Sequence, residues 1–119
     1  MTTHTTPPTI HSAALPDTIR AFLAAHTARE ADAAVRTFTR DAVVVDDGEI
    51  FHGTEQVLAF LRNAGSQYTY TTEFISARRE DDAHWEVVNR IEGDFPGNVA
   101  DLTYRFTLTD GLISELTIG

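Results

Sequence analysis

The sequence contains no cysteine and no lysine, and each absence removes a class of chemistry. Without cysteine the chain has no disulfide, no thiolate nucleophile and no zinc–thiolate site. Without lysine it has neither a Schiff-base lysine nor a lysine general base, and all nine basic residues are arginines. No basic cluster exceeds Arg78-Arg79, and the formal net charge is −9. Nucleic acids and anionic membranes bind positive surfaces, so we expect neither as a partner.

Long apolar runs are missing as well, and nothing approaches the length of a transmembrane helix. The opening residues, MTTHTTPPTIHSA, lack the basic start and apolar core of a signal peptide. We therefore expect a flexible tail over residues 1–14 and a cytoplasmic protein. Residues 15–119 are long enough to form a single domain with one core.

Apolar residues recur at helical spacing in three segments of the first half of the chain. The spacing predicts helices over about 16–27 and 31–38, and a third that begins with Thr54 as its N-cap and ends near residue 64. In the first helix, one stripe carries Ile19, Phe22, Leu23 and His26.

Strand signals follow the second predicted helix and fill the second half of the chain. The run Val43-Val44-Val45 leads into Asp46-Asp47-Gly48, which is a strong hairpin-turn signal, and residues 50–52 form the return strand. Four strands over 68–118 are separated by turns at 80–82, 94–98 and 110–111. Period-two alternation gives the last three strands inward faces of Trp85, Val87, Asn89 and Ile91; of Leu102, Tyr104, Phe106 and Leu108; and of Ser114, Leu116 and Ile118.

The strand over 68–79 has two possible registers. Either Tyr68, Tyr70, Thr72 and Phe74 face the interior, which we favour, or the alternate set that includes Glu73 does. Helices gathered on one side of an antiparallel or mixed sheet define an α+β fold. We expect three N-terminal helices on a strongly curved sheet, which together form a cone with one open end.

Two segments carry a resemblance to a known family: DAVVVDDGEIFHGTEQVLAFL after two helices, and GDFPGNVADLTYRFTLTDGLISEL near the end. Over roughly residues 15–118 the chain resembles the NTF2-like superfamily, and within it the SnoaL-like proteins related to ketosteroid isomerase. The resemblance implies the cone-shaped fold. It leaves the activity open, because the superfamily includes isomerases, cyclases, dehydratases, epoxide hydrolases and proteins without known chemistry.

The isomerase pattern of that superfamily is only partly present. Its general-base aspartate corresponds to Asp46, at the end of Ala42-Val-Val-Val-Asp46. Its oxyanion-donating tyrosine and its protonated aspartate correspond to Phe22 and Tyr104, so two of three roles are changed, which argues against steroid isomerisation. The epoxide-hydrolase branch of the superfamily uses an Asp–Arg–Asp set that points into the cavity. That activity is disfavoured here, because strand alternation places the side chain of Arg90 on the outer face of the sheet. The cyclase aspartate has no clear counterpart on an inward position.

Asp46 is the best catalytic candidate, because proton abstraction beside a carbonyl needs a carboxylate made more basic by apolar walls. We expect it to face Trp85 and Phe106 across a pocket. The alternative is a solvated turn residue. Tyr104 is the second catalytic candidate, as a hydroxyl donor to an oxyanion, with a packed core tyrosine as the alternative.

Seven further side chains are expected to contact a substrate, and they share predicted inward positions. Asn89 is the polar member, since a buried amide needs a partner, and His26 is the ionisable one, although most such histidines are structural. The full set is Phe22, His26, Tyr70, Trp85, Asn89, Phe106 and Leu116. No histidine or carboxylate pair has metal-site spacing, and no nucleotide or phosphate motif occurs, so we expect neither metal nor cofactor.

These features favour a cofactor-independent isomerase, cyclase or dehydratase that acts on a small, largely apolar carbonyl compound. A non-catalytic module of the same fold, which binds a small molecule or assembles with other proteins, is the alternative. The outer sheet face carries Glu86, Val88, Arg90, Thr103 and Arg105, which is polar but suits a homodimer.

Overall fold

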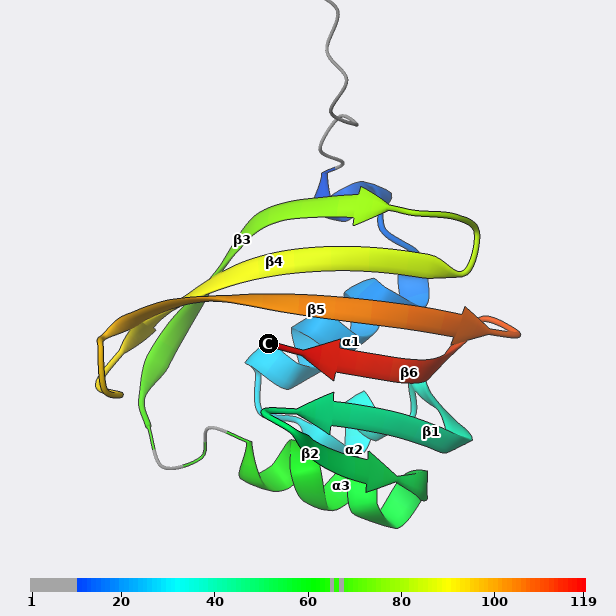
Figure 1. Cartoon of the computed structure of the whole chain (residues 1–119), viewed down its shortest axis with the longest axis horizontal. Coiled ribbons are helices and arrows are strands. Elements are labelled where there is room, and N and C mark those ends of the chain that lie inside the picture. The colour runs from blue at the N-terminus through cyan, green and yellow to red at the C-terminus, as the bar shows by residue number, and fades with distance from the viewer. Residues whose placement is uncertain (1–10, 65, 67) are drawn as a thin grey trace, which may run out of the picture.

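One six-stranded sheet and three N-terminal helices make up the fold (Figure 1). The computed structural model describes residues 11–64, 66 and 68–119. Within them no helix is long and apolar enough to cross a membrane. In chain order the elements are η1 (Ser12–Ala14), α1 (Asp17–Thr27), α2 (Ala31–Val35), β1 (Phe38–Asp46), β2 (Glu49–His52), α3 (Gly53–Asn63), β3 (Tyr70–Arg79), β4 (His84–Gly93), β5 (Val99–Thr109) and β6 (Leu112–Ile118).

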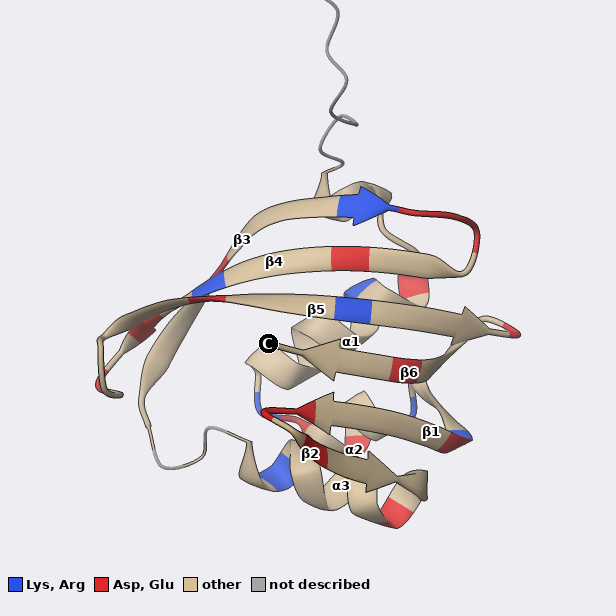
Figure 2. Cartoon of the chain, viewed as in Figure 1, with Lys and Arg blue, Asp and Glu red and all other residues tan. Residues whose placement is uncertain are grey.

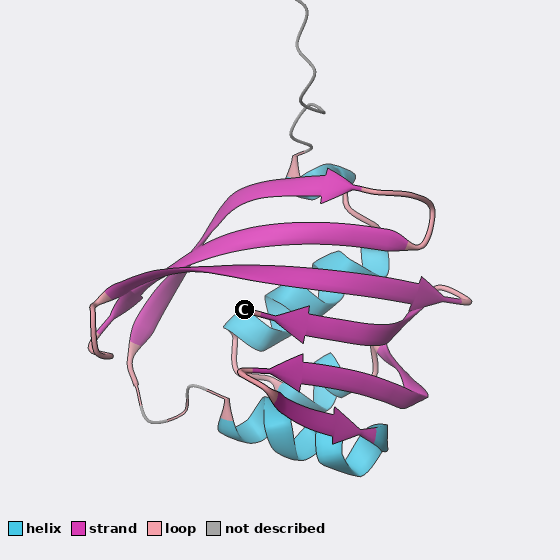
Figure 3. Cartoon of the chain, viewed as in Figure 1, coloured by secondary structure: helices cyan, strands magenta, loops and turns pink. Residues whose placement is uncertain are grey.

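The strands lie in the order β2-β1-β6-β5-β4-β3. Strands β1 and β6 are parallel, and every other neighbouring pair is antiparallel. The helices lie on one side of this sheet (Figure 3). The predicted α+β architecture with a curved, mixed sheet is therefore confirmed. Of the predicted tail, residues 1–10 lie outside the described residues, and Ser12–Ala14 form the 3₁₀ helix η1.

Helix α1 supplies the centre of the core. Ile19 and Phe22 are fully buried on its inner face, and Asp17 lies in the first turn, where the helix dipole favours a negative charge. Arg20 pairs with Asp17 one turn earlier. The helix ends as Arg29 adopts a left-handed conformation, with φ of 63°, which stops the helical ladder.

The second helix is shorter than predicted: α2 ends at Val35, and Phe38 is the first residue of β1. The Thr37 hydroxyl donates to the Ala34 carbonyl oxygen at 2.6 Å, and the Ile113 N–H donates to the Thr37 carbonyl at 2.8 Å. The chain therefore leaves the helical conformation where it begins to pair with β6. Phe38 still reaches the core, as its apolar spacing indicated.

The predicted N-cap of the third helix is wrong. Helix α3 begins at Gly53, and its N-cap is His52, whose N–H donates to the side-chain oxygen of Gln56 at 2.8 Å. Thr54 lies inside the first turn. Gly53 has φ of +86°, a backbone conformation that glycine adopts without strain and that lets β2 turn directly into the helix.

Bulges explain where period-two alternation succeeds and where it fails. In β3, Tyr70, Thr72 and Phe74 lie on the inner side as favoured, but the register shifts at Ile75, so Ala77 is the next buried residue. The favoured register is therefore right from Tyr68 to Phe74, and Glu73 of the alternative set is exposed opposite Arg90. Extra residues of this kind bend a sheet strongly.

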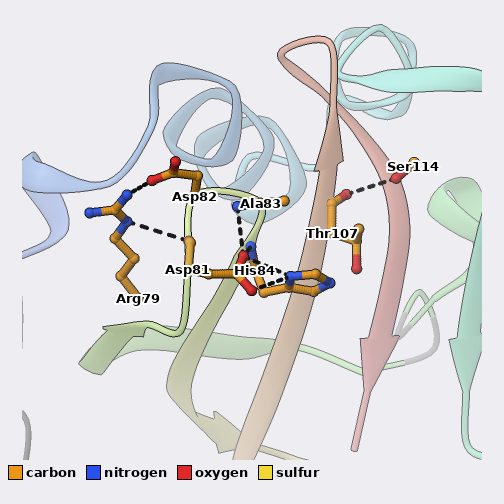
Figure 4. A network of polar contacts seen from close by, with 7 residues as sticks. All are labelled: Arg79, Asp81, Asp82, Ala83, His84, Thr107 and Ser114. Carbon is orange, nitrogen blue, oxygen red and sulfur yellow. Dashed lines mark hydrogen bonds and ion pairs between the residues drawn. The ribbon is translucent and has the colours of Figure 1, made fainter.

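A second bulge separates Thr107 from Leu108 where β5 meets β6. Ile113 is buried in place of Ser114, so the predicted inward position of Ser114 is wrong. The Ser114 hydroxyl donates to the Thr107 carbonyl oxygen at 3.2 Å (Figure 4). The same view shows the β3–β4 turn, where Asp81 accepts hydrogen bonds from the Ala83 and His84 N–H groups.

Several charged residues of β3, β4 and β5 (Figure 2) pair with one another on the outer face of the sheet. The Glu86 carboxylate lies 3.5 Å from Nη2 of Arg78 and 3.3 Å from Nε of Arg105. Arg90 donates two hydrogen bonds to the Asp101 carboxylate. The outward parity of Arg90 is thus confirmed. The homodimer through this face stays a prediction.

Gly93 is required where the end of β4 meets the start of β3. A Cβ atom there would lie 2.2 Å from the Thr69 carbonyl oxygen and 2.7 Å from the Tyr70 Cα, both backbone atoms. The Asp94 carboxylate also accepts the Thr69 N–H at 2.8 Å, which holds the two strand ends together.

We predict that Gly93→Ala lowers the free energy of unfolding by about 1–3 kcal/mol, because backbone atoms cannot give way to the added methyl group. Urea unfolding followed by circular dichroism measures this. Glu92→Ala, at the exposed preceding position, is the matched control and should change stability by less than about 0.5 kcal/mol. Equal stability of the two variants would contradict the close approach of β3 and β4.

Candidate functional site

A cavity of about 340 Å³ lies where α1 and α3 end and β3 begins, and we call it the acid cavity. Strands β1 and β6 finish beside it, and β5 crosses it. Its polar side chains are Asp46, Tyr104 and His26, together with the phenols of Tyr68 and Tyr70. Among the described residues, the rest of the wall is apolar: Phe60, Ala64, Ile91, Phe95, Pro96, Ala100, Leu102 and Ile118.

Sheet register places Asp46 and Tyr104 on opposite sides of one residue. Asp46 pairs with Ile118 across the parallel β1–β6 contact, and Tyr104 pairs with Ile118 across the antiparallel β5–β6 contact. Since neighbouring strands lie about 4.8 Å apart, the Cα atoms of Asp46 and Tyr104 are separated by roughly 10 Å. Both side chains line the acid cavity, one on either side of Ile118, so one bound molecule can contact the carboxylate and the phenol.

The Asp46 carboxyl group is more basic than an ordinary aspartate. Burial raises its pKa, and the nearby charges of Asp47 and Glu49 raise it further. Both effects act in one direction because each disfavours the ionised form. No described residue hydrogen-bonds this carboxyl group, so its oxygens remain available to a ligand.

A second hollow of about 330 Å³ meets the acid cavity at Asp46, Phe60 and Ala64. Glu49 and Asn63 lie on its wall. Asp46 is consequently approached from two sides, which explains why this carboxyl group is only partly buried. Solvent can deliver or remove a proton through the second hollow without passing the rest of the cavity.

Tyr104 is 4% exposed, and it lines the acid cavity. Burial raises the pKa of its phenol, and the neighbouring Tyr70 and Asp46 raise it further. The hydroxyl group therefore keeps its proton at neutral pH. It makes no hydrogen bond to any other described residue, so it can donate to an oxygen placed in the cavity.

His26 closes the cavity at the end of α1. Burial lowers its pKa, and the charge of Arg29 lowers it further, so the neutral imidazole is favoured. The ring stacks on Phe22, with 5.3 Å between the ring centroids and 13° between the planes. This packing fixes the ring orientation beside the cavity.

Three aromatic rings form one wall of the cavity. Phe95 packs edge-on against Tyr68 and Tyr70, with centroid separations of 6.1 and 6.5 Å. Arg29 holds this wall in place, because its guanidinium lies 5.0 Å from the Tyr70 ring centroid and donates to the Ala64 carbonyl oxygen at 3.1 Å. One side chain thus ties together the ends of α1 and α3 and the start of β3.

Four of the nine predicted site residues line this cavity: Asp46, Tyr104, His26 and Tyr70. The others lie elsewhere. Phe22, Phe106 and Leu116 are at most 1% exposed and form the closed core, because the sheet curves tightly over α1 there. Asp46 therefore shares its cavity with neither Trp85 nor Phe106, contrary to the predicted arrangement.

Trp85 lies near the start of β4, at the end of the strand away from the acid cavity, and the Arg79 guanidinium is 5.7 Å from its ring centroid. Asn89 lines a different cavity, on the other side of α1. Sequence alternation had already placed Ile91, Leu102 and Ile118 inward. Phe95 and Pro96 were missed, since their segment carried only a turn signal and no periodicity.

Within the described residues, no three histidine, aspartate or glutamate side chains lie close enough together to hold a metal ion. The polar groups of the acid cavity instead form an acid–base and hydrogen-bonding set. A carboxylate of raised basicity, a phenol that donates and a neutral imidazole suit proton transfer to and from a bound organic molecule.

Solved structures share this architecture. A protein from Catenulispora acidiphila, with a ketosteroid isomerase-like fold and crystallised with trimethylamine, is 18% identical; the match covers 87% of this chain and 85% of that one, with a TM-score of 0.75. An NTF2-like protein of unknown function from Cytophaga hutchinsonii is 13% identical over 96% and 93% of the two chains, with a TM-score of 0.69. The fold is therefore NTF2-like.

Sequence comparison gives the family. The model of the SnoaL-like domain matches residues 19–116, so the chain belongs to the SnoaL-like family. A crystal structure from Sinorhizobium meliloti, provisionally named a polyketide cyclase, is 33% identical. That match covers 92% of this chain and 100% of the other, with a TM-score of 0.84. No protein of curated function matches the chain.

We predict that Asp46→Asn increases the free energy of unfolding at neutral pH. The folded protein holds the Asp46 proton more tightly than the unfolded chain, so wild-type stability falls as pH rises from about 4 through the raised folded-state pKa. The variant lacks this loss. Urea unfolding between about pH 3 and pH 7 measures it, and the stability difference should shrink toward the acid end. A difference independent of pH would contradict the burial of this carboxyl group.

Proposed function

We propose that the protein is a cofactor-independent enzyme that moves protons on a small, mostly apolar carbonyl compound. One observation carries this proposal: Asp46 and Tyr104 border the same cavity, one residue apart across three strands. Isomerisation, aldol-type cyclisation and dehydration all begin with the same step, which is removal of a proton beside a carbonyl group.

In that step the Asp46 carboxylate takes a proton from the carbon next to the carbonyl. The electron pair of the broken C–H bond moves toward the carbonyl oxygen, which becomes an enolate. Tyr104 donates a hydrogen bond to this oxygen, and its donor is most effective in a cavity from which bulk water is excluded. Asp46 then returns the proton to a different carbon, or the enolate carbon attacks a second carbonyl group, whose oxygen takes the proton back from Asp46 and becomes a hydroxyl group.

The cavity wall indicates which substrates fit. Asp46 is the only acid and no arginine is among the described lining residues, so an anionic substrate would meet repulsion without compensation. His26 adds no positive charge, since its pKa is lowered. A volume of about 340 Å³ is near the lower end for ligand pockets. A neutral, compact molecule with a flat apolar body suits the aromatic wall.

A second candidate is a binding module of the same family without catalysis. Phe22 favours it, because this residue corresponds to the oxyanion-donating tyrosine of the isomerase pattern and is a fully buried phenylalanine. Tyr104 then takes the place of the oxyanion donor, beside the phenols of Tyr68 and Tyr70. Such a module would bind flat apolar ketones in the acid cavity and leave their protons in place.

Hydrogen–deuterium exchange of a simple ketone separates the two candidates without knowledge of the natural substrate. We predict that the protein in D₂O accelerates exchange of the protons beside the carbonyl of cyclohexanone or cyclohex-2-enone, followed by ¹H NMR. Asp46→Asn should slow this exchange by ~10²-fold or more, as expected for loss of a general base. Tyr104→Phe should slow it by about 10²-fold, the scale for loss of an oxyanion donor.

Asp41→Asn is the matched control, because it makes the same chemical change at an exposed residue of the same strand, outside the cavity wall. Its exchange rate should equal that of the wild type. Binding of both ketones without accelerated exchange would favour the non-catalytic module. Equal losses in the Asp46 and Asp41 variants would remove Asp46 from the proposed role.

A further inference from the structure

A second and larger cavity, of about 540 Å³, lies on the other side of α1 from the acid cavity. We call it the Asn89 cavity. Its walls come from η1, from one face of α1 and from the inner face of β3 and β4. Residues 20, 23, 24, 27 and 28 supply the α1 face, whereas His26 of the same helix lines the acid cavity.

The two cavities are neighbours with separate walls. Thr72 of β3 lines the Asn89 cavity, and its register partner Ile91 of β4 lines the acid cavity. No described residue is shared between the two linings. Leu23 and Thr27 of α1 line the Asn89 cavity and His26 lines the acid cavity, so the C-terminal half of α1 separates the two cavities.

Asn89 is the polar group at the floor of the larger compartment. It is 5% exposed, yet its side-chain amide makes no hydrogen bond to any other described residue. Its flanking partners across the sheet are Phe74 and Leu102, which offer no polar atom in their side chains. A buried amide presents one acceptor and two donor positions, and a ligand in the cavity can satisfy both kinds.

The rest of the wall is largely apolar, with Leu15, Leu23 and Phe74 as its larger side chains. Arg20 is the only charged residue of the described lining, and Asp17 already pairs with it. A carboxylate ligand would therefore lose its water without gaining an unpaired cation. A neutral group that both donates and accepts in one plane matches the Asn89 amide.

We propose that this cavity is a second ligand site, distinct from the acid cavity, that takes small neutral carboxamides or lactams with an apolar body. The ligand amide exchanges two hydrogen bonds with the Asn89 amide. Its hydrocarbon portion lies between Leu23 on α1 and Phe74 on β3. The site requires no residue of the proposed catalytic set.

Hexanamide is a suitable probe, and sodium hexanoate is its charged counterpart of the same length. Titration of the ¹⁵N-labelled full chain, followed by two-dimensional NMR, should give saturable shifts at the Asn89 side-chain NH₂ and at the backbone N–H of Thr72 and Phe74. Hexanoate should bind at least ~10-fold more weakly, because its charge has no free partner in the cavity.

Two variants test the site independently. Asn89→Leu removes the amide and should weaken hexanamide binding by ~10-fold or more, the scale of one or two lost hydrogen bonds. Ala24→Phe leaves Asn89 intact and fills the cavity from an exposed position on α1, so it should abolish the shifts. Ala21→Phe, exposed on the same helix and outside both linings, is the matched control and should bind like the wild type.

Three results would each overturn the proposal: absence of saturable shifts in the wild type, undiminished binding by Ala24→Phe, or shifts centred on Tyr68, Ala100 and Tyr104. The last result would assign the amide to the acid cavity. If Asn89→Leu does not fold, the comparison of Ala24→Phe with Ala21→Phe still decides. Because the assay measures binding alone, it is independent of whether Asp46 acts in catalysis.

Discussion

The parallel contact between β1 and β6 determines the geometry of the candidate site. It sets Asp46 beside Ile118, and the antiparallel β5–β6 contact sets Tyr104 on the far side of the same residue. Neither hairpin alone could do this, since nearly half of the chain separates Asp46 from Tyr104. The pairing depends in turn on the early end of α2, after which Thr37 and Phe38 join Ile113.

Curvature is the second requirement of the site. Bulges in β3 and between β5 and β6 bend the sheet around α1, and they leave Phe22, Phe106 and Leu116 in a closed core. The cone opens only beyond this core. As a result the charged and phenolic groups near the strand ends remain reachable, while the centre of the domain stays dry.

Alternation of apolar residues predicted much of this arrangement, because successive side chains point to opposite faces of the sheet wherever a strand runs without a bulge. Leu102, Tyr104 and Ile91 face inward as expected, and Asp46 continues the inward set of Val44. The bulges themselves have no clear sequence signal here, which is why Ser114 was misplaced. The spacing of apolar residues also shows which face a side chain is on but not how deeply it is buried. Phe22, Phe106 and Leu116 could therefore not be distinguished from residues that line a cavity.

Loop residues were beyond prediction for a different reason. Phe95 reaches the cavity because Asp94 holds the start of β3, through a contact between residues 25 positions apart. Arg29 likewise joins segments 35 positions apart. Division of the inner space by α1 depends on such contacts too. It gives one small domain two compartments of different chemistry, one with a carboxylate and one with a neutral amide.

The proposed chemistry depends on a partly buried carboxyl group at position 46 that lies beside apolar walls. Titration of ¹³C-labelled protein by carboxyl-detected NMR, with Asp46→Asn to assign the resonance, measures its pKa directly. We predict a value above the ~3.9 of an unperturbed aspartate. A value at or below that of an exposed aspartate would mean that the group is solvated, and it would contradict the proposed role of Asp46 as a base.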